Sequence, residues 1–357
     1  MSCPGRSSLP ALGRRASRSQ RSCTRARRRP CGLWGLVLLS VAVVGVPAAA
    51  QDPVQSAPRQ LEAEIRVAAV QLSLDTAMLR SLESYRLRIA EKVEQSLASR
   101  PDLIVFPEYT AAFLAVIPHR RELEGAGSVA EALERIRARD PLAVGLRELL
   151  LLNSGWVERA LEEVFGRLAR EHGVAILAGS YFARPDDPGP VRLTNRAVVF
   201  GDDGRRLYEQ DKVYLTPFEE ELLGLSPGEP AEARPFALGG ARVGVTICRD
   251  TFFSDWEPRL AGSDLWVDIK ANGTPYTQEE RQNFERALPA RIRSGEVPYG
   301  LTVCLTGEFL DLMWEGKSSL VRKEPPDRVL TVGAAASPQE EEILSFSVPL
   351  RRVPLRR

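Results

Sequence analysis

Cys248 stands at the end of an apolar segment, residues 241–247, and is followed at once by the charged residues Arg249 and Asp250. A buried strand over this segment would deliver the thiol to the carboxyl edge of a sheet, where α/β proteins commonly build their sites. A cysteine there can attack a carbonyl or nitrile carbon once a base has taken its proton. On cysteine usage alone, however, Cys248 is more often a small core residue, so partners elsewhere in the chain must decide between the two interpretations.

The usual partner of a catalytic thiol, a histidine, is scarce in this chain. His119 and His172 are the only two, and His172 precedes Gly173 at the end of a predicted helix, where it fits a C-terminal cap. No cysteine and histidine spacing resembles a zinc site, and we expect neither a metal nor a cofactor. The groups that remain for the chemistry are a carboxylate and an ammonium.

Three separated motifs supply such groups, and together they resemble the nitrilase superfamily of carbon–nitrogen hydrolases, in its amidase-like branch. Residues 106–108 are similar to the glutamate motif of that family, residues 212–217 to its lysine motif and residues 247–250 to its cysteine motif. Each motif is weak alone, but all three occur in the family's order and each follows an expected strand. The resemblance covers roughly residues 65–350.

The resemblance implies a catalytic triad of Glu108, Lys212 and Cys248. Cys248 would attack the substrate carbon, while Glu108 would take the thiol proton and pass it to the leaving amine. Lys212 would stabilise the negative oxygen of the tetrahedral intermediate, assisted by the backbone N–H of Arg249. Water, activated by Glu108, would then hydrolyse the thioester.

Three further residues are candidates for supporting or substrate-binding roles. Glu220, eight positions after Lys212, matches a second glutamate by which the family positions its lysine, and its neighbour Glu219 is the rival that we consider less favoured. Asp250 is expected either to gate the pocket or to cap a helix over residues 252–260. Arg249 adds a cation beside the nucleophile.

Lys270 adds a second cation at a place where the family carries pocket residues. With Arg249 it favours an anionic substrate, or else both cations are simply paired. The substrate itself is not identified by these residues.

Three functions follow from the motifs. The first is a hydrolase that cleaves a non-peptide linear C–N bond of a small-molecule amide or related compound. The second is an N-acyltransferase, because residues 212–220 are similar to those of apolipoprotein N-acyltransferases; those proteins carry several membrane helices before the catalytic domain, whereas this chain has at most one apolar segment. The third is a non-catalytic binding protein on the same fold. The resemblance also implies a homo-oligomer.

The elements that must position these residues follow an α/β pattern. Residues 65–72 predict a buried strand, residues 82–97 an amphipathic helix that ends before Pro101, and residues 103–106 a second strand, which is typical of a βαβ unit. Another amphipathic helix is expected at 156–171, and a helix broken near Pro289 at 277–292. Further strands are expected at 174–180, 195–200, 205–208, 241–247, 265–269, 301–305, 318–321, 329–332 and 343–348. The resemblance implies a four-layer αββα sandwich, which agrees with this alternation.

Residues 110–155 are long for a connection between two elements and contain two predicted helices. We expect them to form a lid or a pocket. A helical pair that serves only packing or a subunit interface is the open alternative.

The first fifty residues differ from the rest of the chain. They contain nine arginines and no acidic residue, then an apolar run over residues 33–46 and an Ala-rich ending, which are the three parts of a secretory signal peptide. We therefore expect a signal peptide at 1–50, a linker at 51–62, the hydrolase domain at 63–350 and a basic tail at 351–357. The protein would be exported, to the periplasm or outside the cell; an uncleaved segment that anchors it to the membrane is the alternative.

Charge argues against a nucleic-acid partner. Without the nine N-terminal arginines, 39 basic residues face 47 acidic ones, so the expected domain carries a net negative charge. Only Cys248 and Cys304 remain after residue 50, which provides no disulfide framework.

Overall fold

The computed structural model describes residues 63–140, 142 and 144–351. The expected signal segment, the linker before residue 63 and the tail beyond Arg351 lie outside the described residues. In the part of the chain that is described, no helix is both long enough and apolar enough to span a bilayer.

The first sheet begins with β1 (Glu64–Leu74), which the apolar segment at 65–72 predicts. Its strand order is β5-β4-β3-β2-β1-β13, with β1, β2 and β3 parallel and the outer pairs antiparallel. The bounds of the other strands are Leu103–Val105 for β2, Ala175–Ala183 for β3, Thr194–Phe200 for β4, Arg206–Asp211 for β5 and Glu342–Pro349 for β13.

The second sheet contains the cysteine strand. β7 pairs with β8, and β8 with β9, all three parallel, while β6 and β11 pair antiparallel at the two sides and β12 extends β11. The bounds are Phe236–Leu238 for β6, Ala241–Ile247 for β7, Leu265–Lys270 for β8, Tyr299–Phe309 for β9, Ser319–Glu324 for β11 and Arg328–Ala334 for β12. β1 pairs with β9 in parallel over Leu72–Leu74, so the two sheets meet at the carboxyl ends of these strands.

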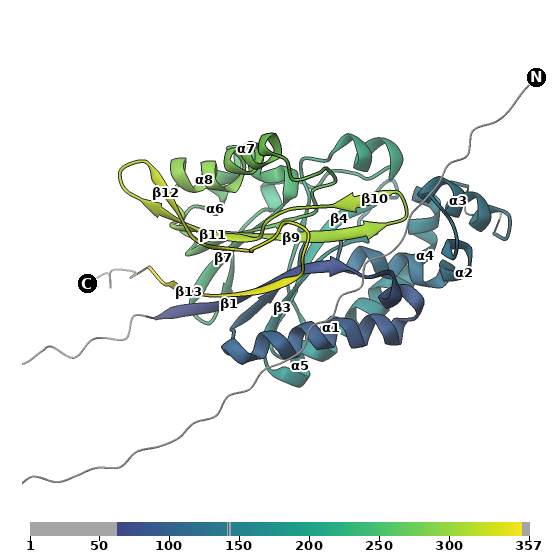
Figure 1. Ribbon diagram of the computed structural model, residues 1–357, viewed down its shortest axis with the longest axis horizontal. Helices are drawn as coiled ribbons and strands as arrows, with labels where there is room; N and C mark the ends of the chain where they lie inside the picture. The colour runs from purple at the N-terminus through teal and green to yellow at the C-terminus, as the bar shows by residue number, and fades with distance from the viewer. Residues whose placement is uncertain (1–62, 141, 143, 352–357) are drawn as a thin grey trace, which may run out of the picture. The chain divides into compact units, whose positions relative to one another are not determined.

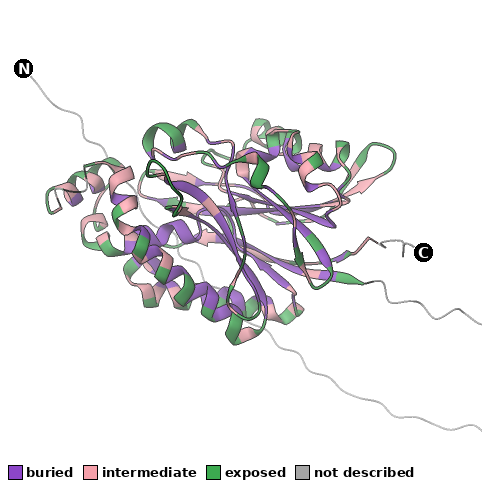
Figure 2. Cartoon of the chain, turned by 180° about the vertical axis from the view of Figure 1, so that it is seen from behind, coloured by how far each residue is buried: buried purple, intermediate pink, exposed green. Residues whose placement is uncertain are grey.

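Three apolar cores separate four layers, which confirms the expected αββα sandwich. Along β1, alternate residues such as Val67 and Ala69 face the second sheet, whereas Ala68 and Val70 face α1 (Leu82–Ser96). The third core packs the outer face of β8, at Trp266, against α6 and α8 (Trp256–Leu260, Leu288–Ser294). Figure 1 shows α1 and α5 below the sheets and α6, α7 and α8 above them, and Figure 2 shows that the central strands between are largely buried.

The helices agree with the sequence in most places. α1 ends before Pro101, and the predicted break near Pro289 separates α7 (Gln278–Arg286) from α8. One prediction is wrong: the helix expected to begin at residue 156 begins ten residues earlier. α4 (Leu146–Leu161) starts early because Leu149 and Leu150 extend its buried face toward the N-terminus, beyond the expected start. At its other end, α4 continues through a wide π turn into α5 (Arg167–His172).

The long excursion after β2 is helical almost throughout. A 3-10 segment (Ala111–His119) is followed by α2 (Arg120–Leu123), by α3 (Val129–Arg137) and by the first part of α4. Ser128 caps α3 by accepting a hydrogen bond from the backbone N–H of Glu131. These helices gather beyond one end of the sheets, next to the short strand β10 (Leu312–Trp314) (Figure 1).

Candidate functional site

The three residues of the expected triad all lie at carboxyl ends of strands. Glu108 follows β2, Lys212 follows β5 directly, and Cys248 follows β7. The side chains of Glu108 and Lys212 are buried, and Cys248 is half-buried. Since the carboxyl ends of the two sheets meet, residues more than one hundred positions apart in the sequence are brought together.

The ammonium of Lys212 lies between two glutamates. Its Nζ is 2.8 Å from Oε1 of Glu108 and 2.8 Å from Oε2 of Glu219. Asn195 on β4 donates from Nδ2 to both glutamates, at 3.0 and 2.8 Å, and its carbonyl accepts the backbone N–H of Lys212. The lysine is therefore fixed at both its backbone and its side chain before any substrate binds.

The two glutamates differ in how fully their oxygens are used. The carboxylate of Glu219 accepts hydrogen bonds from Tyr109 Oη, Asn195 Nδ2, Lys212 Nζ, and both the backbone N and Oγ1 of Thr216. Glu108 uses Oε1 for Lys212 and Asn195, but its Oε2 accepts only the backbone N–H of Ala271, at 2.9 Å. Oε2 of Glu108 thus retains a lone pair that can accept a proton.

Electrostatics also separate the two acids. Burial raises the pKa of Glu219, but the charge and hydrogen bond of Lys212 outweigh it and hold that pKa below its usual value. The pKa of Glu108 is raised, first by burial and then by the charge of Glu219, against the opposing charge of Lys212. One lysine cannot neutralise two carboxylates, so Glu108 carries the excess negative charge and is the better base.

The same charges keep Lys212 protonated. Burial lowers its pKa, but Glu108, Cys248 and Glu219 more than compensate and hold the pKa above its ordinary value. A permanent cation at this position suits the stabilisation of a developing oxyanion.

Cys248 is held in a backbone conformation that is uncommon for a side-chain-bearing residue. Its φ is 52°, and the neighbour of Glu108, Tyr109, has a φ of 63°. The carbonyl of Cys248 accepts hydrogen bonds from Thr251 Oγ1 at 2.8 Å and Lys270 Nζ at 3.1 Å, which hold this turn. Such left-handed residues persist where surrounding contacts over-determine them, and they cluster at functional sites.

The thiol is neutral in the resting site. Burial and the charge of Glu108 raise the pKa of Cys248 to about 12, although Lys270 and Lys212 act in the opposite direction. A base within reach of the sulfur is therefore needed for this thiol to react near neutral pH.

Glu219, not Glu220, is the glutamate that positions Lys212, so the preference for Glu220 is wrong. Glu220 is exposed, whereas Glu219 is fully buried. Thr216 and Glu219 form a reciprocal cap: Oγ1 of Thr216 accepts the backbone N–H of Glu219, and the glutamate accepts that of Thr216. The π turn over Phe218–Leu222 then directs position 219 inward.

The helix-capping and gating roles expected for Asp250 are also corrected. Its carboxylate lies at 0% exposure and accepts the backbone N–H groups of Val213, Tyr214 and Ile247. α6 begins only at Trp256, after a separate 3-10 turn (Cys248–Phe252). Asp250 therefore ties the segment after Lys212 to the turn that carries Cys248, and burial raises its pKa to about 7.

The two extra cations are both engaged within the protein. The guanidinium of Arg249 donates to the carbonyl of Leu215 and lies 5.9 Å from the ring of Phe253. The ammonium of Lys270 lies 3.1 Å from Oδ2 of the buried Asp268, which neutralises it. For Lys270 this geometry favours the paired alternative over a site for an anionic substrate, whereas Arg249 is held by a hydrogen bond and an aromatic ring rather than by a carboxylate.

Sequence reasoning missed Asn195, Tyr109 and Asp268, the partner of Lys270. A weak signal was present for Asn195, which stands at the start of a strand that ends in an apolar run and must find partners when buried. In the described part of the chain, no three His, Cys, Asp or Glu side chains are grouped so as to hold a metal ion.

Known proteins similar to this chain indicate its family. Residues 66–261 match the family model described as carbon–nitrogen hydrolase. A nitrilase from Pyrococcus abyssi is 34% identical over 178 residues, which is 49% of this chain and 60% of the relative. An apolipoprotein N-acyltransferase from Rhizobium meliloti is 27% identical over 273 residues, covering 68% of this chain and 43% of the relative. The chain thus spans about half the length of the curated relatives that it matches.

Solved structures share the fold. The carbon–nitrogen hydrolase of Helicobacter pylori G27 aligns with a TM-score of 0.57 at 17% identity, over 80% of this chain and 89% of its own. An amidase from Nesterenkonia sp. AN1 aligns with a TM-score of 0.54 at 19% identity, over 80% of this chain and 93% of its own. The family model covers more than half of the sequence and contains all three expected catalytic residues, so the chain belongs to the carbon–nitrogen hydrolase family.

Proposed function

We propose that the protein is an amidase-type hydrolase that cleaves a non-peptide linear C–N bond through a thioester on Cys248. The observation that carries this proposal is the buried Lys212 between Glu108 and Glu219, in a site that also holds a strained cysteine. Where no histidine lies beside a catalytic thiol, a base must accept its proton and a fixed cation must stabilise the oxyanion. The related Nesterenkonia amidase carries a product of acrylamide addition on its active-site cysteine.

Acylation follows from the atoms of the site. As the sulfur of Cys248 attacks the substrate carbon, its proton moves to Oε2 of Glu108, the oxygen with a free lone pair. The carbonyl electron pair moves to oxygen, where Lys212 and the backbone N–H of Arg249 stabilise the negative charge. When the intermediate collapses, Glu108 returns the proton to the nitrogen, the C–N bond breaks and the amine leaves.

Deacylation repeats these steps with water in place of the thiol. Glu108 takes a proton from the water as its oxygen attacks the thioester carbon, and Lys212 again stabilises the oxyanion. The C–S bond then breaks, the sulfur is protonated by Glu108, and the acid leaves.

Acyl transfer to an amine is the second candidate function. The match to an apolipoprotein N-acyltransferase over 68% of this chain favours it. In that reaction, an amine replaces water as the nucleophile that attacks the thioester, and Glu108 takes the proton from the amine. The acyl group then ends in a new amide.

The test is a panel of amides, nitriles and esters, followed by intact-mass measurement of the protein and by product analysis. We expect a covalent adduct on Cys248 and release of the amine, both lost in Cys248→Ala while the fold, checked by circular dichroism, is retained. A new amide after addition of an amine would favour acyl transfer. No adduct and no turnover with any compound would contradict both enzyme proposals and favour a binding protein on this fold.

Export and assembly stay predictions. Detection of the mature N-terminus by mass spectrometry in the natural source would decide between a cleaved signal peptide and a membrane anchor. Light scattering would measure the expected homo-oligomer.

A further inference from the structure

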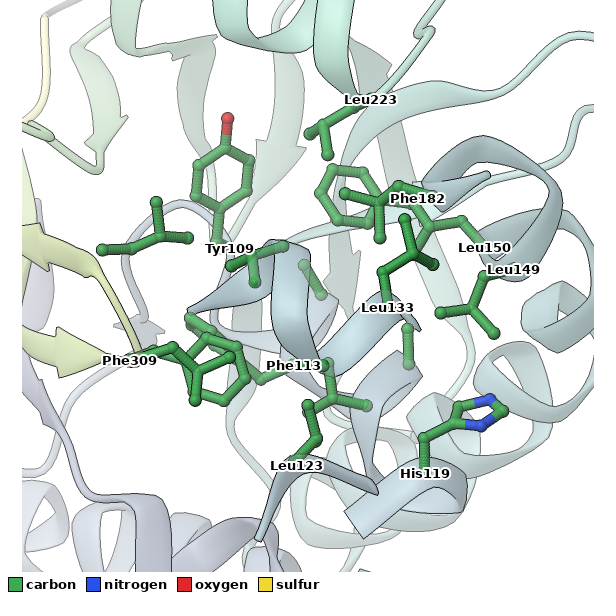
Figure 3. A pocket seen from close by; sticks show the side chains of 18 of the residues that line it. Tyr109, Phe113, His119, Leu123, Leu133, Leu149, Leu150, Phe182, Leu223 and Phe309 are labelled. Carbon is green, nitrogen blue, oxygen red and sulfur yellow. The ribbon is translucent and has the colours of Figure 1, made fainter. Parts of the chain in front are cut away.

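The helical excursion after β2 encloses an apolar cavity of about 110 Å³ (Figure 3). Its walls come from distant parts of the chain: the 3-10 segment after Glu108, α3, the first turns of α4, and the end of β9 with the turn that follows. Phe113, Leu133, Leu150, Phe182 and Phe309 are typical of the lining. Since side chains from all of these segments line the cavity, the excursion helps to form a pocket rather than only a packed helical pair.

Tyr109 and His119, which line the cavity, direct their polar atoms into other hydrogen bonds. Tyr109 donates its hydroxyl to Oε1 of Glu219 at 2.8 Å, and Nε2 of His119 lies 2.8 Å from Nδ2 of Asn153. Figure 3 shows the Tyr109 hydroxyl at one edge of the pocket and the His119 ring at another. The pocket therefore offers hydrocarbon surface and almost no hydrogen bond, which suits an apolar group and disfavours water.

The pocket adjoins the catalytic site through a shared wall. The ring of Tyr109 lines the cavity, while its hydroxyl belongs to the cluster around Lys212. Phe218, next to Glu219, also lines the cavity. Ala271, whose backbone N–H holds Glu108, packs against the same apolar core as the lining.

Charge couples the two places as well. Burial raises the pKa of the Tyr109 hydroxyl, and the charges of Glu108, Glu219 and Cys248 raise it further. Tyr109 also follows Glu108 directly in the chain, so a group seated against its ring lies beside the residue proposed as the base.

We propose that this pocket binds the hydrocarbon chain on the acyl side of the substrate, so that the substrates are amides of aliphatic or arylalkyl acids. This inference rests on the proposed function and specifies its substrate class. The acyl group stays on Cys248 through both steps, so a pocket for the chain holds the thioester in place while the amine leaves and water enters. The cavity is somewhat smaller than an engineered protein cavity of about 150 Å³ that binds benzene. The largest acyl chain that fits should therefore have roughly the volume of benzene or less.

A series of straight-chain primary amides, from acetamide upward, tests the proposal. We expect kcat/KM to rise about fourfold for each added methylene, corresponding to ~0.8 kcal/mol per buried CH₂, until the pocket is filled. A parallel series of N-alkyl acetamides carries the same chains on the amine side and should show no such rise. A flat acyl series, or a rise confined to the N-alkyl series, would overturn the assignment.

Two leucines on α4 make a matched pair of variants. Leu149 lines the cavity, whereas Leu152 on the same helix is 50% exposed and does not. Leu149→Trp should lower the ratio of kcat/KM for the best long amide to that for acetamide by tenfold or more. Leu152→Trp should leave the ratio unchanged, and equal ratios in the two variants would contradict the proposal.

An enlarged pocket provides the opposite test, which does not depend on how well the tryptophan variant folds. Leu123 lines the cavity and is half-buried, so Leu123→Ala should move the optimum toward longer chains. An unchanged optimum would count against the pocket.

Binding of the amide series to Cys248→Ala, measured by calorimetry, separates this inference from the proposed function. Chain-dependent binding without turnover by the wild type would contradict the proposed hydrolysis but retain the pocket. Turnover of acetamide without chain dependence would retain the hydrolysis and overturn the pocket.

Discussion

Lys212 and Lys270 are both buried, both lie at the carboxyl end of a strand, and both lower the pKa of Cys248. Their surroundings differ. Lys212 faces two glutamates, whereas Lys270 faces a single aspartate and donates to the backbone of the cysteine. The first arrangement combines a base with a cation, and the second neutralises a cation and fixes a turn.

A buried ion pair can take part in proton transfer when its charges do not balance. Around Lys212, burial and then the charge of a second carboxylate, Glu219, raise the pKa of Glu108, which favours its acceptance of a proton. Around Lys270, burial lowers the pKa of the lysine but the charge of Asp268 restores it above the ordinary value, so the two charges balance one to one. The rings of Phe252 and Phe284, within 5.5 Å of Nζ, complete its surroundings.

The largest expected effect comes from removing each cation with a side chain of similar shape. Lys212→Met should lower kcat by about 10²–10³, because the oxyanion loses its main stabilising charge. Lys270→Met should lower it by only about tenfold. Both variants should lose stability, since each leaves a buried carboxylate unpaired. Single-turnover rates with the best amide measure the difference, and equal losses of kcat would break the comparison.

The two adjacent glutamates supply the next test. Glu219→Gln keeps the shape but removes the charge that balances Lys212, so the activity should fall about tenfold to a hundredfold and the free energy of unfolding by ~1–3 kcal/mol. Glu220→Gln, one position along and exposed, should leave both quantities as in the wild type. Urea denaturation and steady-state kinetics check the pair. A larger effect at Glu220 would restore the prediction made from the sequence.

The pH dependence of thiol reactivity separates an effect of the charge of Lys270 on Cys248 from an effect of packing alone. In Lys270→Met with Asp268→Asn, both charges are absent together and the fold should be better retained than in the single variant. Lys270 lowers the pKa of Cys248, and Asp268 raises it by a smaller amount. The pH profile of iodoacetamide alkylation should therefore shift upward in the double variant. An unshifted profile, with stability retained, would show that Lys270 acts only on the backbone.

The last expected effect is on stability rather than on rate, and it concerns the pH dependence of stability through Asp250. Its pKa is raised by burial to about 7 in the folded protein, above the ordinary 3.8. A raised folded pKa favours the fold most at pH below about 4, and this contribution is lost as the pH rises toward 7. The difference in unfolding free energy between wild type and Asp250→Asn should therefore change across this range. A constant difference would mean that the carboxylate stays ionised throughout.

Much of the fold was predictable because its signals are local. The buried strands read as apolar runs, since parallel strands covered on both faces carry no alternating pattern. The start of α4 was missed for a related reason: Leu149 to Leu152 also fit a packed excursion, and only contact with the core shows which of them are buried. The thiol, the lysine and Glu108 were found by motif order rather than by any single motif.

The sequence by itself determined which groups are available for chemistry and, through Thr216-Pro217-Phe218-Glu219, contained a capping pattern that marks Glu219. Only the tertiary structure decided which glutamate faces Lys212, because one π turn changes which side chain points inward. It also decided that Asp250 joins two loops and that the excursion after β2 encloses a pocket. These properties depend on contacts between residues far apart in the chain, and spacing along a sequence does not specify distances across a fold.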